Sequence, residues 1–275
     1  QIEIPFGQVP YESSEGYLRK DIMSASLSQL RQKNTGNDCL HNKRKFMMVA
    51  IMQPYLFPYI GYYQLIKAVD IFVIYDDVNY IKRGYVNRNS ILANGNKYYF
   101  TLELMKSSQN KLINEIEIGN NGEKILKTIR MAYKKAPFFD VVYPLLEVMF
   151  KHTEKNLSKF LEFSLISILN FLEIKTNTKM ASKTEKNRAL TGQEKIIDIC
   201  KRLGADCYVN PMGGRELYSK TRFLEENIQL KFLSPDTLKY CQFGGAFVPN
   251  LSIIDVMMFN SKEAVKEMLK RYTLF

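Results

Sequence analysis

Two adjacent aspartates, Asp76 and Asp77, follow the apolar run 71–75. A carboxylate can take the proton of an attacking amine or hydroxyl, so either residue is a candidate general base. Together they could also hold Mg²⁺ with substrate phosphates. The alternative is a strand-end turn in which the pair binds Lys82 and Arg83. Both interpretations place the pair at the end of a buried strand.

A third aspartate, Asp255, lies in the apolar segment 251–259. Ser252 is expected to cap a short helix there, with Asp255 at its third position. The carboxylate is then either a partner of this cap or a third catalytic group.

Cations and amides are concentrated after the aspartate pair. Between residues 78 and 114, six Lys or Arg residues accompany a single acidic residue. Arg can meet a phosphate or carboxylate through two N–H groups, and Asn offers both donors and an acceptor. The candidate substrate-binding residues of this segment are Arg83, Asn87, Arg88, Asn89 and Lys106.

Two turns rich in Pro and Gly follow other expected strands. The run 48–52 ends at Gln53, and a helix with Tyr62 on its inner face comes next. The short strand 206–210 runs into Pro211-Met212-Gly213-Gly214-Arg215, whose backbone N–H groups could bind an anion. The candidate binding residues of these turns are Gln53, Tyr62, Asn210, Gly213, Gly214 and Arg215.

The elements that must position these residues follow an α/β pattern. Apolar runs 48–52 and 71–75 on either side of a helix indicate a right-handed βαβ unit. A second repeat follows: a capping box at Thr191 and Glu194 opens a helix, the strand 206–210 comes next, and residues 216–227 are expected to be helical.

Two further elements are expected beside the sheet. Asn94-Gly95 is typical of a hairpin turn, and the antiparallel pair should carry Arg88 and Lys106. Apolar residues at helical spacing between 121 and 174 predict a helical insertion at 120–175. We therefore predict a Rossmann-like parallel sheet with helices on both faces, an added antiparallel hairpin and this insertion.

The first part of the chain differs from the rest. Residues 1–46 lack strong apolar periodicity, although a short helix could form within 18–30. We expect an extension or linker there, either disordered or a fused remnant. Residues 47–275 should form the α/β domain.

Charge and composition restrict the function classes. There are 39 Lys and Arg against 28 Asp and Glu, a net charge of +11, which indicates a solvated basic surface or an anionic partner. The four cysteines form no CxxC pair and only two histidines occur, which disfavours a disulfide framework or a zinc site. Free thiols favour the cytoplasm, and no apolar run approaches the ~20 residues of a membrane span. RNA binding is disfavoured because the basic cluster is confined to one loop and hairpin.

Several motifs recur in order along the chain, among them Gln53-Pro54-Tyr55, Tyr75-Asp76-Asp77, Asn87-Arg88-Asn89 and Gly192-Gln193-Glu194. The full set comprises residues 50–55, 57–62, 73–78, 81–84, 87–89, 192–194, 208–211, 213–214 and 251–260. Together they resemble the WbqC-like protein family from about residue 47 to the end. The resemblance implies a role in bacterial O-antigen or other surface-polysaccharide biosynthesis. It also implies transfer of an acyl or aminoacyl group to a nucleotide-linked amino sugar.

The strand followed by Pro-x-x-Gly-Tyr also looks like the turn that carries paired histidines in nucleotidyltransferases. Here tyrosines or other residues stand at those positions, which puts ordinary nucleotidyl transfer in doubt. We therefore expect a transferase in which Arg and Lys hold the phosphates of an anionic nucleotide sugar and Asp is the general base. The alternatives are a non-catalytic nucleotide- or sugar-binding module and a nucleotidyltransferase-like enzyme without histidines. Mg²⁺ is the one cofactor that the residues suggest.

Overall fold

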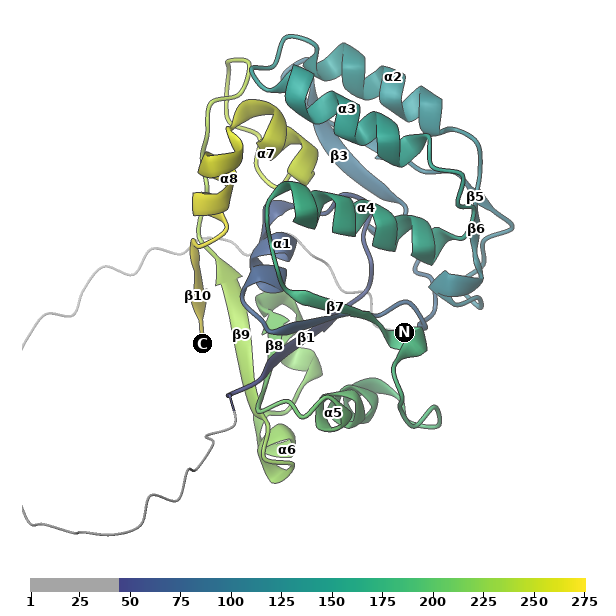
Figure 1. The fold of residues 1–275 in the computed structure, drawn as a ribbon, viewed down its shortest axis with the longest axis vertical. Coiled ribbons are helices and arrows are strands. Elements are labelled where there is room, and N and C mark those ends of the chain that lie inside the picture. Colours follow the sequence, from purple (N-terminus) through teal and green to yellow (C-terminus); the bar gives the residue numbers. More distant parts are fainter. Residues whose placement is uncertain (1–44) are drawn as a thin grey trace, which may run out of the picture. The chain divides into compact units, whose positions relative to one another are not determined.

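A computed structural model describes residues 45–275 of the chain (Figure 1). Residues Phe46–Phe275 form one compact unit. The expected extension at 1–46, with its helix within 18–30, lies outside the described residues except for its last two positions. The proposed domain boundaries therefore stay a prediction.

A six-stranded sheet forms the centre of the molecule, in the order β10-β9-β8-β1-β2-β7. All neighbouring strands are parallel except that β10 joins β9 antiparallel. The central strands read as continuous apolar runs because helices cover both faces of the sheet. The bounds are β1 (Met48–Met52), β2 (Ile71–Ile74), β7 (Asn177–Met180), β8 (Cys207–Pro211), β9 (Gln229–Pro235) and β10 (Tyr272–Leu274).

Helices lie on both faces of this sheet, as Figure 1 shows. Along β1, Ala50 packs into the core on one face, and Val49 and Ile51 pack into the core on the other. The first face carries α1 (Ile60–Lys67), α4 (Leu157–Phe171), α7 (Ile253–Phe259) and α8 (Lys262–Met268); the second carries α5 (Gly192–Arg202) and α6 (Lys220–Glu225). The predicted Rossmann-like α/β fold is confirmed.

The expected hairpin is present as β3 (Arg88–Ala93) and β4 (Asn96–Thr101). Asn94 and Gly95 have φ values of 51° and 74°, as a two-residue turn of type I′ requires. The prediction that Lys106 lies on this hairpin is wrong. Thr101 of β4 pairs with Arg88, the first residue of β3, so residues beyond Thr101 have no partner in β3. The chain instead forms β5 (Leu104–Met105), which pairs with β6 (Glu117–Ile118).

Three helices lie in the stretch with helical periodicity: α2 (Gly122–Tyr133), α3 (Phe139–Phe150) and α4. The helix expected at 216–227 is divided. The 3₁₀ helix η3 (Met212–Leu217) ends first, and Ser219 then caps the separate helix α6 by accepting a hydrogen bond from the Arg222 N–H at 3.3 Å. Two further 3₁₀ helices are η1 (Ile113–Glu115) and η2 (Ala181–Lys183).

The expected capping box at α5 is wrong. Thr191 is the N-cap residue but makes no side-chain cap bond. The Glu194 carboxylate instead accepts two hydrogen bonds from the Arg222 guanidinium, at 3.0 and 2.7 Å. A bidentate, charge-assisted pair is stronger than a neutral cap bond, so it determines where the side chain lies.

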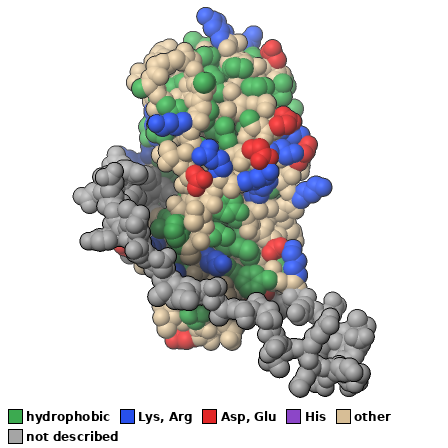
Figure 2. Space-filling view, turned by 90° about the vertical axis from the view of Figure 1, so that its left-hand side faces the viewer, with side chains coloured by type: hydrophobic (Ala, Val, Ile, Leu, Met, Phe, Trp, Pro, Cys, Tyr) green, Lys and Arg blue, Asp and Glu red, His purple; other side chains and the backbone are tan. Residues whose placement is uncertain are grey.

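Charges of both signs are interspersed on the face shown in Figure 2. On α8, for example, Lys262 and Lys266 both pair with Glu173. No continuous basic patch is visible among the described residues on this face. Among residues 45–275, no helix has the length and apolarity needed to cross a membrane.

Candidate functional site

The sheet reverses its direction of winding between β1 and β8. After β1 the chain passes to α1 on one face, and after β8 it passes to α6 on the other. Two adjacent parallel strands that send their chains to opposite faces leave a crevice beyond their carboxyl ends, which is where ligands bind in open α/β sheets. The residues after β1, β2 and β8 therefore define the candidate site.

A buried ionic cluster lies at the end of β2. The Asp77 Oδ2 atom is 2.8 Å from Lys186 Nζ and 3.8 Å from Lys195 Nζ. The Lys186 side chain is only 2% exposed, and the side chains of Asp77 and Lys195 are each 14% exposed. Lys186 also donates to the backbone carbonyls of Ala181 and Thr184. Within residues 45–275, Lys82 and Arg83 form no ion pair with Asp76 or Asp77, so the expected alternative partners of the aspartate pair are wrong.

One oxygen of this cluster is unpaired. Asp77 Oδ1 is shielded from solvent and has no hydrogen-bond partner among residues 45–275. A buried acceptor left without a donor costs roughly 1–3 kcal/mol. A proton donor that enters the crevice and bonds this oxygen is therefore favoured.

The neighbouring Asp76 points elsewhere. It is 1% exposed, and its Oδ1 accepts from the Ser182 N–H at 2.9 Å while Oδ2 accepts from the Asn114 amide at 3.4 Å. The two carboxylates thus do not converge. Within the described part of the chain, no group of three or more His, Cys, Asp or Glu side chains gathers. The pair does not fit a Mg²⁺ site, because lysines hold Asp77 and backbone and amide donors hold Asp76.

Aromatic side chains adjoin the Asp77 cluster on the α5 side. Lys195 Nζ lies 5.2 Å from the centre of the Tyr75 ring. Burial raises the pKa of Tyr75, and the charge of Asp77 and then the nearby Tyr218 raise it further. Ser219 N donates to Gln193 Oε1 at 2.6 Å, which joins the start of α5 to the segment after η3. The ends of β2 and β8 and the start of α5 therefore meet here.

Hydrogen bonds fix the turn after β1. The Tyr62 hydroxyl is buried and donates to the backbone carbonyl of Gln53 at 2.8 Å. The Asn89 amide donates to the carbonyls of Leu56 and Phe57 at 2.9 and 2.8 Å. The Gln53 side chain forms no hydrogen bond within residues 45–275 and is half-buried beside the strand end.

The other candidates of the basic segment divide into buried and exposed residues. Asn87 is buried, accepts from the Tyr80 hydroxyl and donates to the Leu102 carbonyl, both at 2.8 Å. Arg88 is half-buried and lies over the Tyr99 ring. Arg83 and Lys106 are exposed, with φ values of 62° and 49°.

The expected Gly-Gly turn after β8 is the 3₁₀ helix η3. Gly213 and Arg215 are exposed, whereas Gly214 is buried. A Cβ on Gly214 would lie 2.1 Å from Asn210 Nδ2, so this glycine is needed for close packing. The Asn210 Oδ1 atom accepts from the Tyr208 hydroxyl at 3.2 Å.

Asp255 lies fully buried at the start of α7. Its Oδ1 accepts from the Tyr133 hydroxyl at 2.6 Å, and its Oδ2 accepts from the Tyr240 hydroxyl at 2.6 Å and from the Gln242 amide at 2.8 Å. Burial raises the pKa of this carboxyl, and the three hydrogen bonds oppose that effect. The carboxylate thereby joins α7 to α2 and to the segment that follows β9.

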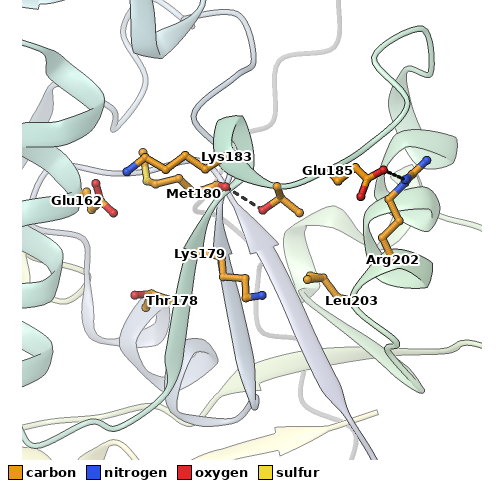
Figure 3. Close-up of a pocket in the computed structure, with 9 residues that line it drawn as sticks. Glu162, Thr178, Lys179, Met180, Lys183, Glu185, Arg202 and Leu203 are labelled. Atoms are coloured by element: carbon orange, nitrogen blue, oxygen red, sulfur yellow. Dashed lines mark hydrogen bonds and ion pairs between the residues drawn. The ribbon is translucent and has the colours of Figure 1, made fainter.

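A hollow of about 480 Å³ lies along the outer edge of β7. Figure 3 shows its side chains, which come from α4, β7, η2 and α5 and include the ion pair between Glu185 and Arg202 at 3.1 Å. None of the sequence-predicted site residues lines it. It lies at an edge strand and not at the carboxyl ends of β1 and β8.

Lys186 and Lys195 are the residues that sequence reasoning missed. Lys186 is the last residue of the segment Lys183-Thr184-Glu185-Lys186, and Lys195 is the last residue of Gly192-Gln193-Glu194-Lys195. The second follows a family motif by one residue, which is a signal that could have been used. Nothing in the local sequence distinguishes Lys186 from the other lysines.

Comparison with known proteins finds a matching family and a similar protein. The sequence model of the WbqC-like protein family matches residues 53–267. A protein of Mycobacterium tuberculosis (strain ATCC 25618 / H37Rv), described as "Uncharacterized protein Rv1507c", is 29% identical over 221 residues. The alignment covers 78% of this chain and 95% of that protein. No solved structure matches the chain.

Proposed function

The chain belongs to the WbqC-like protein family, and from that premise we propose that it is a transferase of bacterial surface-polysaccharide (O-antigen) biosynthesis. Its substrate is an anionic, nucleotide-linked amino sugar, to which it transfers an acyl or aminoacyl group. The single observation that carries this proposal is the Asp77–Lys186–Lys195 cluster, buried at the carboxyl edge of the parallel sheet. In open α/β sheets, ligands bind outside the carboxyl ends of the strands.

Asp77 is the general base of this proposal. The acceptor nitrogen attacks the carbonyl carbon of the donor, and a C–N bond forms as the bond to the leaving group breaks. Asp77 takes the proton released by the nitrogen through its unpaired Oδ1 and returns it to the leaving group. Lys195 stabilises the negative charge that develops on the carbonyl oxygen. Lys186 positions the carboxylate.

Asp76 and Asp255 have positioning roles in this scheme. Both are buried, and both oxygens of each already accept hydrogen bonds from the protein. Asp77 is the one aspartate of the three with a free oxygen. We place the reaction in the cytoplasm, in agreement with the free thiols of Cys200, Cys207 and Cys241.

The first test is a thermal-shift screen of the full chain against nucleotides, nucleotide-linked amino sugars and free sugars. A ligand that binds only the folded state raises the unfolding temperature in proportion to the logarithm of its concentration. We expect the largest shift with a nucleotide-linked sugar. No shift with any of them contradicts the proposal.

The second test separates catalysis from binding. With a ligand in hand, candidate acyl and aminoacyl donors are added and the acylated sugar is measured by mass spectrometry. Asp77→Asn should keep binding and lose product formation, whereas the exposed Asp140→Asn should keep both. Binding without product from the unmodified chain favours the alternative, a non-catalytic sugar- or nucleotide-binding module. The observation behind that alternative is the 2.8 Å ion pair itself, because a buried pair can also serve as a fixed anchor.

A further inference from the structure

Arg88 is a half-buried cation without a counter-ion. No acidic side chain among residues 45–275 forms an ion pair with it, and its Nε is shielded from solvent and has no acceptor. Its guanidinium carbon lies 5.2 Å from the centre of the Tyr99 ring. Removing a charge from water is costly unless an opposite charge or hydrogen bonds replace the water. An anion from outside residues 45–275 could supply this partner.

The position of Arg88 in β3 turns its side chain to the side of the strand opposite Asn87 and Asn89. Side chains alternate between the two sides of a strand, so Asn87 and Asn89 point to one side and Arg88 to the other. The two amides are bound to the Leu102 carbonyl and to the carbonyls of Leu56 and Phe57. These bonds fix β3 against the turn after β1 and hold Arg88 in place between them.

Three neighbouring phenols reach Arg88 through Tyr85. The rings of Tyr55 and Tyr85 have centres 6.0 Å apart. Tyr59 lies near both, since it raises the pKa of Tyr55 and Tyr85 raises the pKa of Tyr59; Arg88 lies near Tyr85 and lowers its pKa. Tyr59 reaches this position by lying over Gly61, where a Cβ would be 2.3 Å from its ring.

These phenols are neutral donors. Burial, and then the neighbouring tyrosines, raise the pKa of Tyr55 and of Tyr59 to about 12. Burial also raises the pKa of Tyr85, while Arg88 opposes the shift. No hydrogen bond within residues 45–275 occupies the three hydroxyls, so each has a proton to donate.

We propose that Arg88 and the hydroxyls of Tyr55, Tyr59 and Tyr85 form a phosphate-binding subsite beside the carboxyl end of β1. A guanidinium fork and three hydroxyl donors suit a tetrahedral oxyanion better than a planar carboxylate, which has only two oxygens. The subsite lies on the α1 side of β1, and the Asp77 cluster lies on the α5 side. Its assignment to the diphosphate of a nucleotide sugar rests on the proposed function; the phosphate site itself does not.

The test is a calorimetric titration of the full chain with inorganic pyrophosphate. Arg88→Gln should weaken Kd by at least about tenfold, because a charge-assisted hydrogen bond is lost. Arg130→Gln removes the same charge from an exposed position on α2 and should leave Kd unchanged. Tyr85→Phe, which keeps the ring and the fold, should weaken Kd by about threefold to tenfold.

The outcomes separate the two proposals. No pyrophosphate binding by the unmodified chain, or equal weakening by Arg88→Gln and Arg130→Gln, overturns the subsite. If Arg88→Gln still binds a nucleotide-linked sugar as tightly as the unmodified chain, the assignment of the subsite to the diphosphate of that sugar is wrong while the proposed function stands. If pyrophosphate binds through Arg88 but no nucleotide-linked sugar binds, the subsite stands and the proposed function fails.

Discussion

Replacing Lys186 by Met tests whether the ionic cluster is as strongly buried as the structure shows. The side chain is 2% exposed and makes a 2.8 Å ion pair with Asp77. Removing one partner of a buried pair costs about 3–5 kcal/mol because the other charge is left uncompensated. Lys195 remains 3.8 Å away and Asp77 keeps 14% exposure, so the loss should be near the lower end, about 3 kcal/mol.

A double-mutant cycle isolates the interaction between the two groups. In the Asp77→Asn background, Lys186→Met leaves no buried carboxylate without a counter-ion. It should therefore lower the free energy of unfolding by only about 1 kcal/mol, mainly through the lost bonds to two backbone carbonyls. The interaction free energy is then about 2 kcal/mol. Urea denaturation near neutral pH measures each variant, and an unchanged m-value shows that the two-state analysis holds.

The exposed Lys183 is the matched control, since Lys183→Met removes the same charge three residues earlier and should change the unfolding free energy by less than about 0.5 kcal/mol. A loss below about 1 kcal/mol for Lys186→Met refutes the reasoning. An equal cost in the Asp77→Asn background refutes it too, because the two groups would then not interact.

Two further predictions concern other parts of the fold. Tyr133→Phe should cost about 2–3 kcal/mol in urea denaturation, because it removes the donor to Asp255 and the acceptor of a backbone N–H; the half-exposed Tyr98→Phe should cost almost nothing, and an equal cost for both would contradict the prediction. Glu173→Gln should be destabilising at neutral pH and clearly less so near pH 2. Its hydrogen bonds to Lys262 and then to Lys266 lower the pKa of Glu173 from 4.5 to about 2, so its stabilisation is present above pH 4.5 and is lost as the pH falls. A cost that is the same at both pH values, or one that about 1 M salt does not reduce, would rule out the ionic origin.

The parts of the fold that could be predicted from sequence are those that local residues determine. The apolar runs of β1 and β2 have the length and composition of strands buried on both faces. The hairpin followed from Asn94-Gly95, because few residues other than Asn and Gly adopt two successive positive φ values. The prediction of one helix at 216–227 was wrong because Ser219 begins a new helix. Ser219 is an N-cap residue inside a segment of helical periodicity.

The site depended on contacts between distant parts of the chain. Lys195 and Asp77 are 118 residues apart, and no spacing rule shows which of the chain's many cations returns to a given carboxylate. The adjacent acidic residues suggested one joint site, yet Asp76 is bound by a 3₁₀ helix and Asp77 by two lysines. Residue type alone could not separate Asn89, which binds two backbone carbonyls, from Arg88, which the alternation of the same strand turns to the other side.

The reversal of winding between β1 and β8 also has a consequence for synthesis. On the ribosome, β1 (Met48–Met52) emerges early and gains one neighbour from β2 soon afterwards. The other edge of β1 stays unpaired until β8, which begins at Cys207, has been synthesised. At ~5–20 residues per second, the roughly 150 intervening residues take on the order of 10–30 s. During that interval an apolar central strand presents an unpaired edge, which is the kind of surface on which nascent chains associate and chaperones act.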